Sequence, residues 1–210
     1  MIYQFTEPPL GNNNYLIFDE ESREAALIDC SDTDTAIVEK LEQNNLHLKY
    51  ILLTHAHFDH IGAVCFFKEK YQPTVCLNEA DCALMAQLNQ WQHQMGFPET
   101  DIPTVDLRIN ENTDLKLGTK SIRVITTPGH TPGGVCYLYE DYLFSGDTLF
   151  RGAYGRIDLP GSSATDMKNS LKKLSALPTP LTVYPGHGSP TTIGSEQNNI
   201  QKYLQFDFRQ

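Results

Sequence analysis

The segment ILLTHAHFDHIGAV, residues 51–64, places three histidines and an aspartate within six positions, directly after an apolar run. These ligand-type residues are His55, His57, Asp59 and His60. Neutral imidazole and carboxylate groups suit zinc, iron or manganese, and a His-x-His pair on an irregular loop can turn both rings toward one ion. Asp59 and His60 can then face a second ion. A solvated polar loop is a weak explanation for this cluster, so the motif predicts a metal site.

Three later turns repeat this pattern with a single ligand-type residue each. They carry His130 in VITTPGHTPGG, Asp147 in YLFSGDTLF and His187 in LTVYPGHGSP, and each follows an apolar, strand-like run by one to four residues. The carboxyl ends of strands border the ligand crevice in open α/β sheets, so these residues are expected to converge there. His47 and His93 lack this context and are expected to be ordinary histidines.

Such a set of ligands indicates hydrolytic chemistry. Two ions about 3.5–4 Å apart can share a bridging carboxylate and a bridging water, whose pKa falls from 15.7 to roughly 7. The nucleophile then forms at neutral pH without a protein base. The glycines beside the ligands, Gly129, Gly146 and Gly186, permit the close backbone approach that such a site requires.

The elements that position these residues can be read from hydrophobic spacing. Strands are predicted at NYLIF, AALID, YILLT, TVCLN, DLKL, IRVIT, GVCYLYE, YLFSG and LTVYP. Helical spacing joins Ile37 and Leu41; Leu84, Leu88, Trp91 and Met95; and Met167, Leu171, Leu174 and Leu177 behind a cap at Ser163, and we expect these stripes to be core. Residues 96–114 have no clear period and are predicted to form a long surface connection. The mixture predicts an α/β or α+β domain with helices outside sheet.

Composition narrows the class of protein. The 210 residues are 40% hydrophobic, enough for one sizeable core, and we expect a single domain over residues 1–210. The formal net charge of −10 disfavours nucleic acid and anionic membranes as partners. The amino terminus does not resemble a signal peptide and no segment could span a bilayer, so a cytoplasmic location is expected.

The five cysteines, an odd number, include no CxxC pair. They are Cys30, Cys65, Cys76, Cys82 and Cys136. Neither a disulfide framework nor a zinc knuckle is indicated, and buried, unreactive thiols are expected.

The motifs together closely resemble the metallo-β-lactamase-fold superfamily, with its HxHxDH signature followed by separate His, Asp and His ligands. The resemblance runs from NNNYLIFD to PGHGSPTTIGSE. It implies an α+β fold, a four-layer αββα sandwich with the metals at one edge. It also implies two divalent ions, Zn²⁺ being expected and iron or manganese the alternatives. By this resemblance the first ion is held by His55, His57 and His130, the second by Asp59, His60 and His187, and Asp147 bridges them.

Within the superfamily, the segments SGDTLF, GRIDLPG and YPGHGSPTTIGSE resemble the glyoxalase II-related group. That resemblance implies hydrolysis of a small-molecule thioester, a hydroxyacylglutathione such as lactoylglutathione. Asp59 is then expected to orient the nucleophile, and Arg156 either contacts a substrate carboxylate or forms a salt bridge with Asp158. True lactamases are disfavoured, because they resemble exported proteins and generally lack a bridging aspartate like Asp147.

Two departures leave alternatives open. Larger glyoxalase II enzymes grip glutathione with a basic carboxy-terminal extension, but the 23 residues after His187 hold only Lys202 and Arg209 as basic residues. Cys30 also stands where the group tends to have a proline. A mononuclear iron persulfide dioxygenase of the same fold, using His57, His130 and Asp147, is the alternative, followed by a metal-binding module without catalysis. The oligomeric state stays open.

Overall fold

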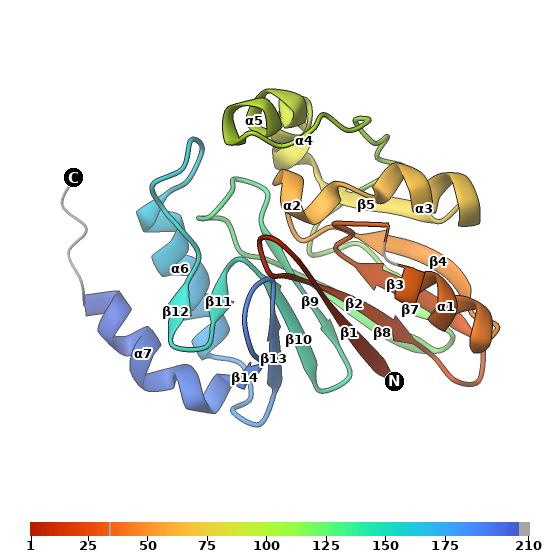
Figure 1. Cartoon of the computed structure of the whole chain (residues 1–210). Helices are drawn as coiled ribbons and strands as arrows, with labels where there is room; N and C mark the ends of the chain where they lie inside the picture. Colours follow the sequence, from red (N-terminus) through yellow and green to blue (C-terminus); the bar gives the residue numbers. More distant parts are fainter. Residues whose placement is uncertain (34, 206–210) are drawn as a thin grey trace.

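The computed structural model describes residues 1–33 and 35–205, which form two facing β-sheets with helices on both outer sides (Figure 1). The first six-stranded sheet has the order β1-β2-β3-β4-β5-β6 and the second has the order β14-β13-β10-β9-β8-β7. The strands of the first are β1 (Ile2–Glu7), β2 (Asn12–Phe18), β3 (Glu24–Ile28), β4 (His47–Leu52), β5 (Thr74–Asn78) and β6 (Leu107–Ile109). Those of the second are β7 (Leu115–Leu117), β8 (Lys120–Thr126), β9 (Val135–Tyr139), β10 (Tyr142–Gly146), β13 (Thr182–Pro185) and β14 (Thr191–Thr192).

The helices divide between the two outer faces. Those beside the first sheet are α1 (Thr35–Gln43), α2 (Phe58–Ile61), α3 (Val64–Tyr71), the 3-10 turn η1 (Glu79–Asp81), α4 (Cys82–Met85) and α5 (Leu88–Met95). Those beside the second are α6 (Ala164–Ser175) and α7 (Ile193–Gln205) (Figure 1). A short hairpin of β11 (Leu149–Phe150) and β12 (Ala153–Tyr154) completes the structure.

Alternation along β2 shows how the sequence creates the layers. Tyr15 and Ile17 pack between the two sheets, whereas Leu16 and Phe18 pack toward the helices of the first sheet. Successive side chains of a strand point to opposite faces, so a strand that is apolar throughout must be covered on both sides. All residues of β2 are indeed buried.

Three apolar layers follow from this arrangement. The outer layer on the first sheet includes Ile37 of α1 and Phe67 of α3, and the outer layer on the second includes Met167 and Leu171 of α6. The middle layer joins the two sheets, with Tyr137 of β9 among its members. The predicted four-layer αββα sandwich is confirmed. A single domain over 1–210 stays a prediction, and Arg209 lies outside the described residues.

Several elements differ from the predictions. Residues 96–114 are not connection throughout, because β6 pairs in parallel with β5 through Cys76 and Leu107; only one residue of this short strand, Ile109, is buried, which leaves little hydrophobic signal. The helical stripe that begins at Leu84 is divided into α4 and α5. In it Leu88 is core, but Trp91 lines a cavity, and the side chain of Met95 is outside the described part. The sequence prediction also omitted β1, β6, β11, β12, β14, α2, α3 and α7.

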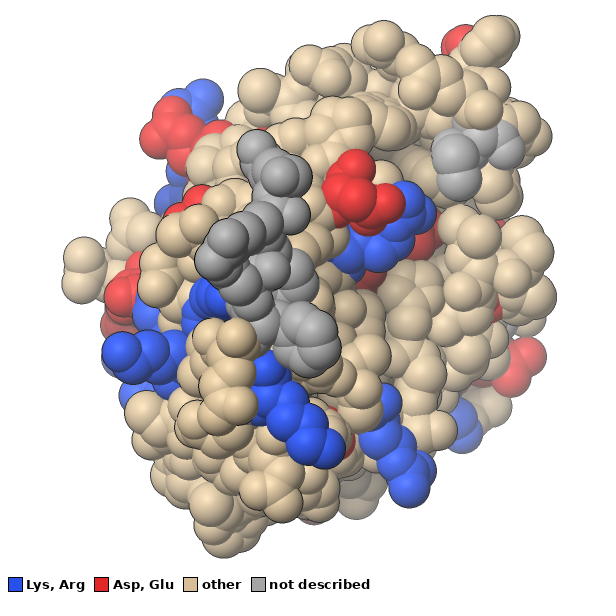
Figure 2. Space-filling view, turned by 90° about the vertical axis from the view of Figure 1, so that its left-hand side faces the viewer, with Lys and Arg blue, Asp and Glu red and all other residues tan. Residues whose placement is uncertain are grey.

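The cysteines match their prediction only in part. Cys30, Cys76 and Cys136 are buried, whereas Cys65 and Cys82 are half-buried, and all five are free thiols. Within the described ranges, no helix is long and apolar enough to cross a membrane. Figure 2 shows acidic and basic side chains interspersed on the side of the molecule that bears α6 and α7, so the excess negative charge is not gathered there.

Candidate metal centre

Seven ligand-type side chains meet where strands of both sheets end. The segment with His55 and His57 follows β4, His130 follows β8, Asp147 follows β10, and His187 follows β13. Their side-chain ligand atoms fall into three groups, within each of which the atoms lie no more than 4.8 Å apart. The groups are His55, His57 and His130; His55, His60 and Asp147; and Asp59, His60 and His187. The structure therefore brings together every residue predicted to bind metal, and that they hold metal stays a prediction.

The HAHFDH segment divides its ligands between a loop and a helix. His57 has extended backbone angles (φ −74°, ψ 148°) and immediately precedes α2, so His55 and His57 lie on an irregular stretch. Asp59 and His60 lie in α2 itself, in which His60 is fully buried. This change of conformation lets one short segment serve two neighbouring groups.

Asp147 lies between these groups. Its Oδ1 is 3.6 Å from Nε2 of His60, while its Oδ2 is 3.5 Å from Nε2 of His130 and 3.7 Å from Nε2 of His187. On either side, His187 Nε2 is 3.3 Å from Asp59 Oδ2, and His130 Nε2 is 2.9 Å from His57 Nδ1. One carboxylate thus faces both sets of histidines.

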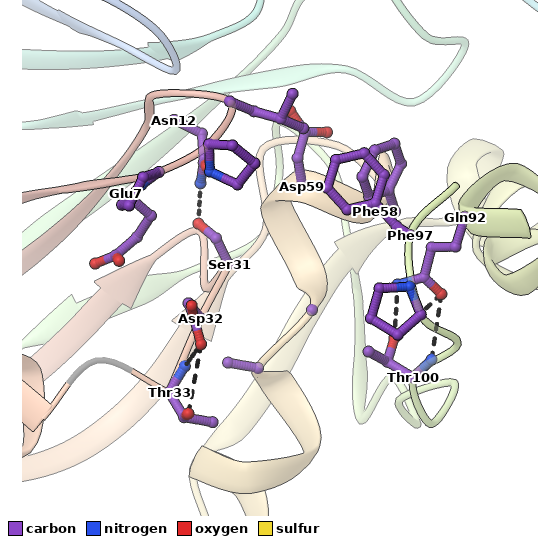
Figure 3. A pocket seen from close by; sticks show the side chains of 16 residues that line it. Glu7, Asn12, Ser31, Asp32, Thr33, Phe58, Asp59, Gln92, Phe97 and Thr100 are labelled. Carbon is purple, nitrogen blue, oxygen red and sulfur yellow. Dashed lines mark hydrogen bonds between the residues drawn. The ribbon is translucent and has the colours of Figure 1, made fainter. Parts of the chain in front are cut away.

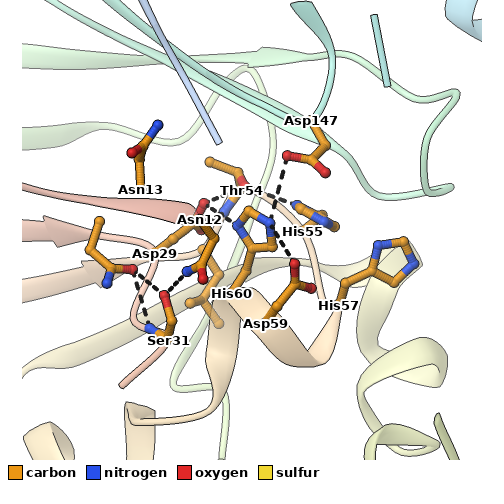
Figure 4. A network of polar contacts seen from close by, with 12 residues as sticks. Asn12, Asn13, Asp29, Ser31, Thr54, His55, His57, Asp59, His60 and Asp147 are labelled. Atoms are coloured by element: carbon orange, nitrogen blue, oxygen red, sulfur yellow. Dashed lines mark hydrogen bonds and ion pairs between the residues drawn. The ribbon is translucent and has the colours of Figure 1, made fainter. Parts of the chain in front are cut away.

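Hydrogen bonds at Nδ1 fix which nitrogen faces the centre in three of the histidines, His55, His60 and His130. His60 Nδ1 donates to Asp29 Oδ2 at 2.8 Å, and His130 Nδ1 lies 2.9 Å from the carbonyl oxygen of Arg156. Thr54 Oγ1 donates to Asp29 and so accepts from His55 Nδ1 at 3.0 Å (Figure 4). Carboxylate, hydroxyl or carbonyl partners of this kind orient metal-binding imidazoles and leave Nε2 with its lone pair.

The polar atoms of the centre test whether the residues fit a metal. His55 Nε2, His60 Nε2 and Asp147 Oδ1 are buried and have no hydrogen-bond partner among residues 1–33 and 35–205. Buried polar atoms are nearly always satisfied, and an orphaned group costs about 1–3 kcal/mol. These three atoms belong to one group, and all are nitrogen or oxygen atoms that can coordinate a metal, so they fit a divalent cation.

The pKa values reflect the crowding of this centre. Burial, aided by the neighbouring histidines, holds the pKa of His55 well below its usual range and lowers that of His57 to about 3. Burial also opposes the charged form of His60, but Asp59, Asp29 and Asp147 outweigh it and raise the pKa to about 10. Burial likewise acts against the charged form of Asp59, but the surrounding histidines lower its pKa. Burial therefore favours neutral imidazole at His55 and His57.

Asp81 links two ligand-bearing loops and was not predicted from the sequence. Its fully buried carboxylate accepts hydrogen bonds from Ala56 N at 3.0 Å, Thr131 Oγ1 at 2.8 Å and Gly133 N at 2.6 Å. Ala56 lies between two ligand histidines, and Thr131 follows His130. Nothing in its sequence context distinguishes Asp81 from an exposed acid at the start of a helix.

Two further residues brace the turn of His187. Asn13 donates from Nδ2 to the carbonyl oxygens of Pro185 and Gly188, at 3.0 and 2.9 Å, and Tyr15 donates its hydroxyl to Pro185 O at 2.6 Å. Both belong to β2, so one sheet positions a ligand carried by the other. Gly186 lets the turn approach, because a Cβ there would overlap Asp147 Oδ1.

The metal centre opens into a cavity of about 420 Å³, the metal-site cavity, which is lined by His57, Asp59, His130, Asp147 and His187. Arg156 lines it as well, and its guanidinium donates to both carboxylate oxygens of Asp158, each at 2.9 Å. The predicted salt bridge is therefore present, and substrate binding by Arg156 stays a prediction. A second cavity of about 320 Å³ adjoins the first at Leu10, Phe58 and Asp59 (Figure 3).

The sandwich and the His/Asp centre at its edge define the class as a metallo-hydrolase. Residues 8–187 match the family model of the metallo-beta-lactamase superfamily, and the chain belongs to this family. It is 34% identical to hydroxyacylglutathione hydrolase GloC of Haemophilus influenzae over 192 residues. This match spans 89% of this chain and 90% of GloC.

Two solved structures show how closely the fold agrees. The B3 metallo-beta-lactamase BLEG-1 is 35% identical, with a TM-score of 0.88, over 98% of this chain and all of that one. The protein TTHA1623, solved in a di-iron-bound form, is 36% identical, with a TM-score of 0.84, over 94% of this chain and 98% of that one. A relative with two iron ions and a relative that is a lactamase therefore share this architecture.

Proposed function

We propose that this protein is a dinuclear metal-dependent hydrolase of small-molecule thioesters. The observation that carries the proposal is the position of Asp147, whose carboxylate lies between the two groups: Oδ1 is 3.6 Å from His60 Nε2, and Oδ2 is 3.5 Å from His130 Nε2 and 3.7 Å from His187 Nε2. His55, His57 and His130 would hold one ion, Asp59, His60 and His187 the other, and Asp147 would bridge them. Zn²⁺ is the proposed metal, because imidazole and carboxylate donors suit it; iron and manganese are the alternatives.

The bound ions would supply a water of lowered pKa as the nucleophile and a positive charge for the developing oxyanion. The chain supplies the orientation. Asp29 and Thr54 hold His60 and His55 with Nε2 turned inward, and the carbonyl of Arg156 does the same for His130. Asp59, which lines the metal-site cavity, can accept a hydrogen bond from the attacking water and so orient it. A thiolate leaves without strong protonation, so no general acid is needed.

Relatives support the choice of thioester. The similarity to hydroxyacylglutathione hydrolase GloC makes lactoylglutathione the first substrate to test. The proposed partner is therefore a small-molecule thioester, and a cytoplasmic location is part of the same proposal.

The second candidate is a mononuclear iron persulfide dioxygenase. It is favoured by the contacts among His57, His130 and Asp147, in which His130 Nε2 is 2.9 Å from His57 Nδ1 and 3.5 Å from Asp147 Oδ2. Two histidines and one carboxylate form the facial triad of non-heme iron oxygenases.

A metal-loading series separates the candidates. The metal-free protein is reconstituted with Zn²⁺ or with Fe²⁺, and each form is assayed for lactoylglutathione hydrolysis, for oxygen consumption with glutathione persulfide and for hydrolysis of a chromogenic β-lactam. Thioester hydrolysis that depends on added metal supports the proposal. If only the iron form is active, and only in oxygen consumption, the protein is a dioxygenase. If only the β-lactam is hydrolysed, the protein is a lactamase.

A further inference from the structure

The metal-site cavity is lined by apolar side chains as well as by the polar ligand residues. Leu10, Phe58, Trp91, Phe150 and Leu159 line it beside the ligand residues. They come from the β1–β2 turn, α2, α5, β11 and the segment before α6, so segments far apart in sequence all contribute an apolar side chain. Ligand cavities of this kind fix a substrate with a few polar groups and bind the remainder by apolar contact.

The charges of the metal-site cavity do not suit an acidic acyl group. Arg156 is the only Lys or Arg among the described residues that line it, and both oxygens of Asp158 already bond with its guanidinium. The acidic residues in the lining are Asp59 and Asp147. A carboxylate on the acyl group would therefore have to displace Asp158 from the guanidinium of Arg156.

The position of the ligands determines which part of a thioester meets these apolar side chains. The ligands line the metal-site cavity, so the reacting carbonyl would lie there, with the acyl chain on one side of it and the sulfur on the other. The adjoining cavity is lined by amide and hydroxyl side chains, among them Asn12, Ser31, Gln92 and Thr100, together with the acids Glu7 and Asp32 and apolar residues such as Phe97 (Figure 3). Its polar groups suit the amide-bearing arm of a thiol such as glutathione. The acyl group is left with the apolar side chains of the metal-site cavity.

We propose that the metal-site cavity selects thioesters with an apolar or aromatic acyl group larger than lactoyl. This inference rests on the proposed thioesterase function and names the acyl half of its substrate. Each methylene group buried is worth about 0.8 kcal/mol, which corresponds to about fourfold in kcat/KM. Lactoyl is short and carries a hydroxyl, so it leaves most of the apolar wall uncovered.

The kinetic test varies only the acyl group. Lactoyl-, acetyl-, butyryl-, hexanoyl- and phenylacetyl-glutathione are compared with the zinc-reconstituted protein. We expect kcat/KM to rise by about fourfold per methylene from acetyl to hexanoyl, and phenylacetyl to exceed lactoyl. A flat series, or lactoyl as the best substrate, would overturn the inference.

A binding test is independent of turnover. Trp91 is the only tryptophan of the chain and lines the metal-site cavity, so its fluorescence reports occupancy. S-hexylglutathione and S-methylglutathione are thioethers that cannot be hydrolysed. We expect the hexyl compound to change the fluorescence and to bind at least about tenfold more tightly. Equal affinities would contradict an apolar site.

Matched variants locate the effect. Phe150→Ala and Leu159→Ala should remove most of the preference for hexyl over methyl, whereas Phe66→Ala, an exposed aromatic outside both cavities, should leave it unchanged. A preference that survives both cavity variants would sink the assignment. If S-hexylglutathione binds as expected but no thioester is hydrolysed, the proposed function has failed and the apolar site stands.

Discussion

The imidazole of His60 and the carboxylate of Asp29 form a buried pair, with His60 Nδ1 2.8 Å from Asp29 Oδ2 and the two side chains 0% and 2% exposed. Asp29 also accepts from the backbone N–H and the hydroxyl of Thr54, both at 2.8 Å (Figure 4). One carboxylate therefore orients His60 directly and His55 through Thr54. It therefore sets the direction of both buried Nε2 atoms that lack a hydrogen-bond partner among the described residues, those of His55 and His60.

Replacing Asp29 with Asn should weaken metal binding while preserving the volume of the side chain. The amide nitrogen would face donors, so His60 and Thr54 would lose their orientation, and metal affinity should fall by about 10–100-fold. Competition with a chromophoric chelator for Zn²⁺ measures this metal affinity. Asp32→Asn, an exposed acid nearby, is the control and should keep full affinity. An unchanged affinity for Asp29→Asn would contradict this role.

Asp81→Asn should destabilise the fold itself. Its carboxylate holds the loops of Ala56 and Thr131 together from a fully buried position. Leaving buried donors unsatisfied costs about 1–3 kcal/mol, so the free energy of unfolding in urea should fall by roughly 2 kcal/mol. Glu79→Gln removes an acid two residues earlier that forms an exposed ion pair with Arg108, and it should have almost no effect. Equal losses in both variants would exclude the proposed link.

Removal of metal should lower thermal stability. The centre would bind ions only when residues from both sheets are assembled, so a metal ion present at a thousand times its dissociation constant would stabilise the native state by about 4 kcal/mol. A chelator should lower Tm, and Zn²⁺ should restore it. A Tm that is the same with and without metal would show that these residues do not hold it.

The carboxylate of Asp19 should make stability depend on pH. Hydrogen bonds from the backbone N–H and hydroxyl of Ser22 hold its pKa below the usual 3.8, against a smaller effect of burial. The stabilisation of the folded state by ionised Asp19 is complete above about pH 4. It is lost as the pH falls through the lowered pKa of Asp19. Asp19→Asn should therefore cost roughly 1 kcal/mol at pH 7 and progressively less below pH 4. A cost independent of pH, or an equal pH effect in the exposed neighbour variant Glu20→Gln, would refute this account.

The pairing of Arg156 with Asp158 makes their variants informative in opposite directions. Both side chains are more than half exposed, so solvent screens the ion pair and it should contribute little to stability. If Arg156 binds a substrate carboxylate, Arg156→Ala should raise KM for succinylglutathione more than for acetylglutathione. Asp158→Ala should lower KM for succinylglutathione, because it frees the guanidinium of Arg156. Parallel changes for both substrates would assign Arg156 to structure alone.

The clustering of these His and Asp side chains could be predicted from the sequence because each follows a predicted strand. His130, Asp147 and His187 each stand a few residues beyond an apolar run, and the ends of those runs meet in the fold. Asp29 gives a similar signal, since it directly follows β3. Its neighbour Cys30 is not a candidate ligand, because burial raises the pKa of its thiol well above the usual range.

Other features depend on contacts that local sequence does not encode. Asp81 acts through backbone groups of two distant loops, and such partners leave no pattern of residue types. Trp91 has the spacing of a core residue, but α5 turns it toward a cavity. Strand β6 is too short and too exposed to show alternation, and only its pairing with β5 defines it.

The most direct test of the central proposal is hydrolysis of lactoylglutathione by the zinc-reconstituted protein, followed by the loss of thioester absorbance beside a His130→Ala variant. The account predicts hydrolysis that requires added metal and falls to the background rate in His130→Ala, with loss of bound metal in the same variant. Hydrolysis that persists in His130→Ala or in the metal-free protein would contradict it.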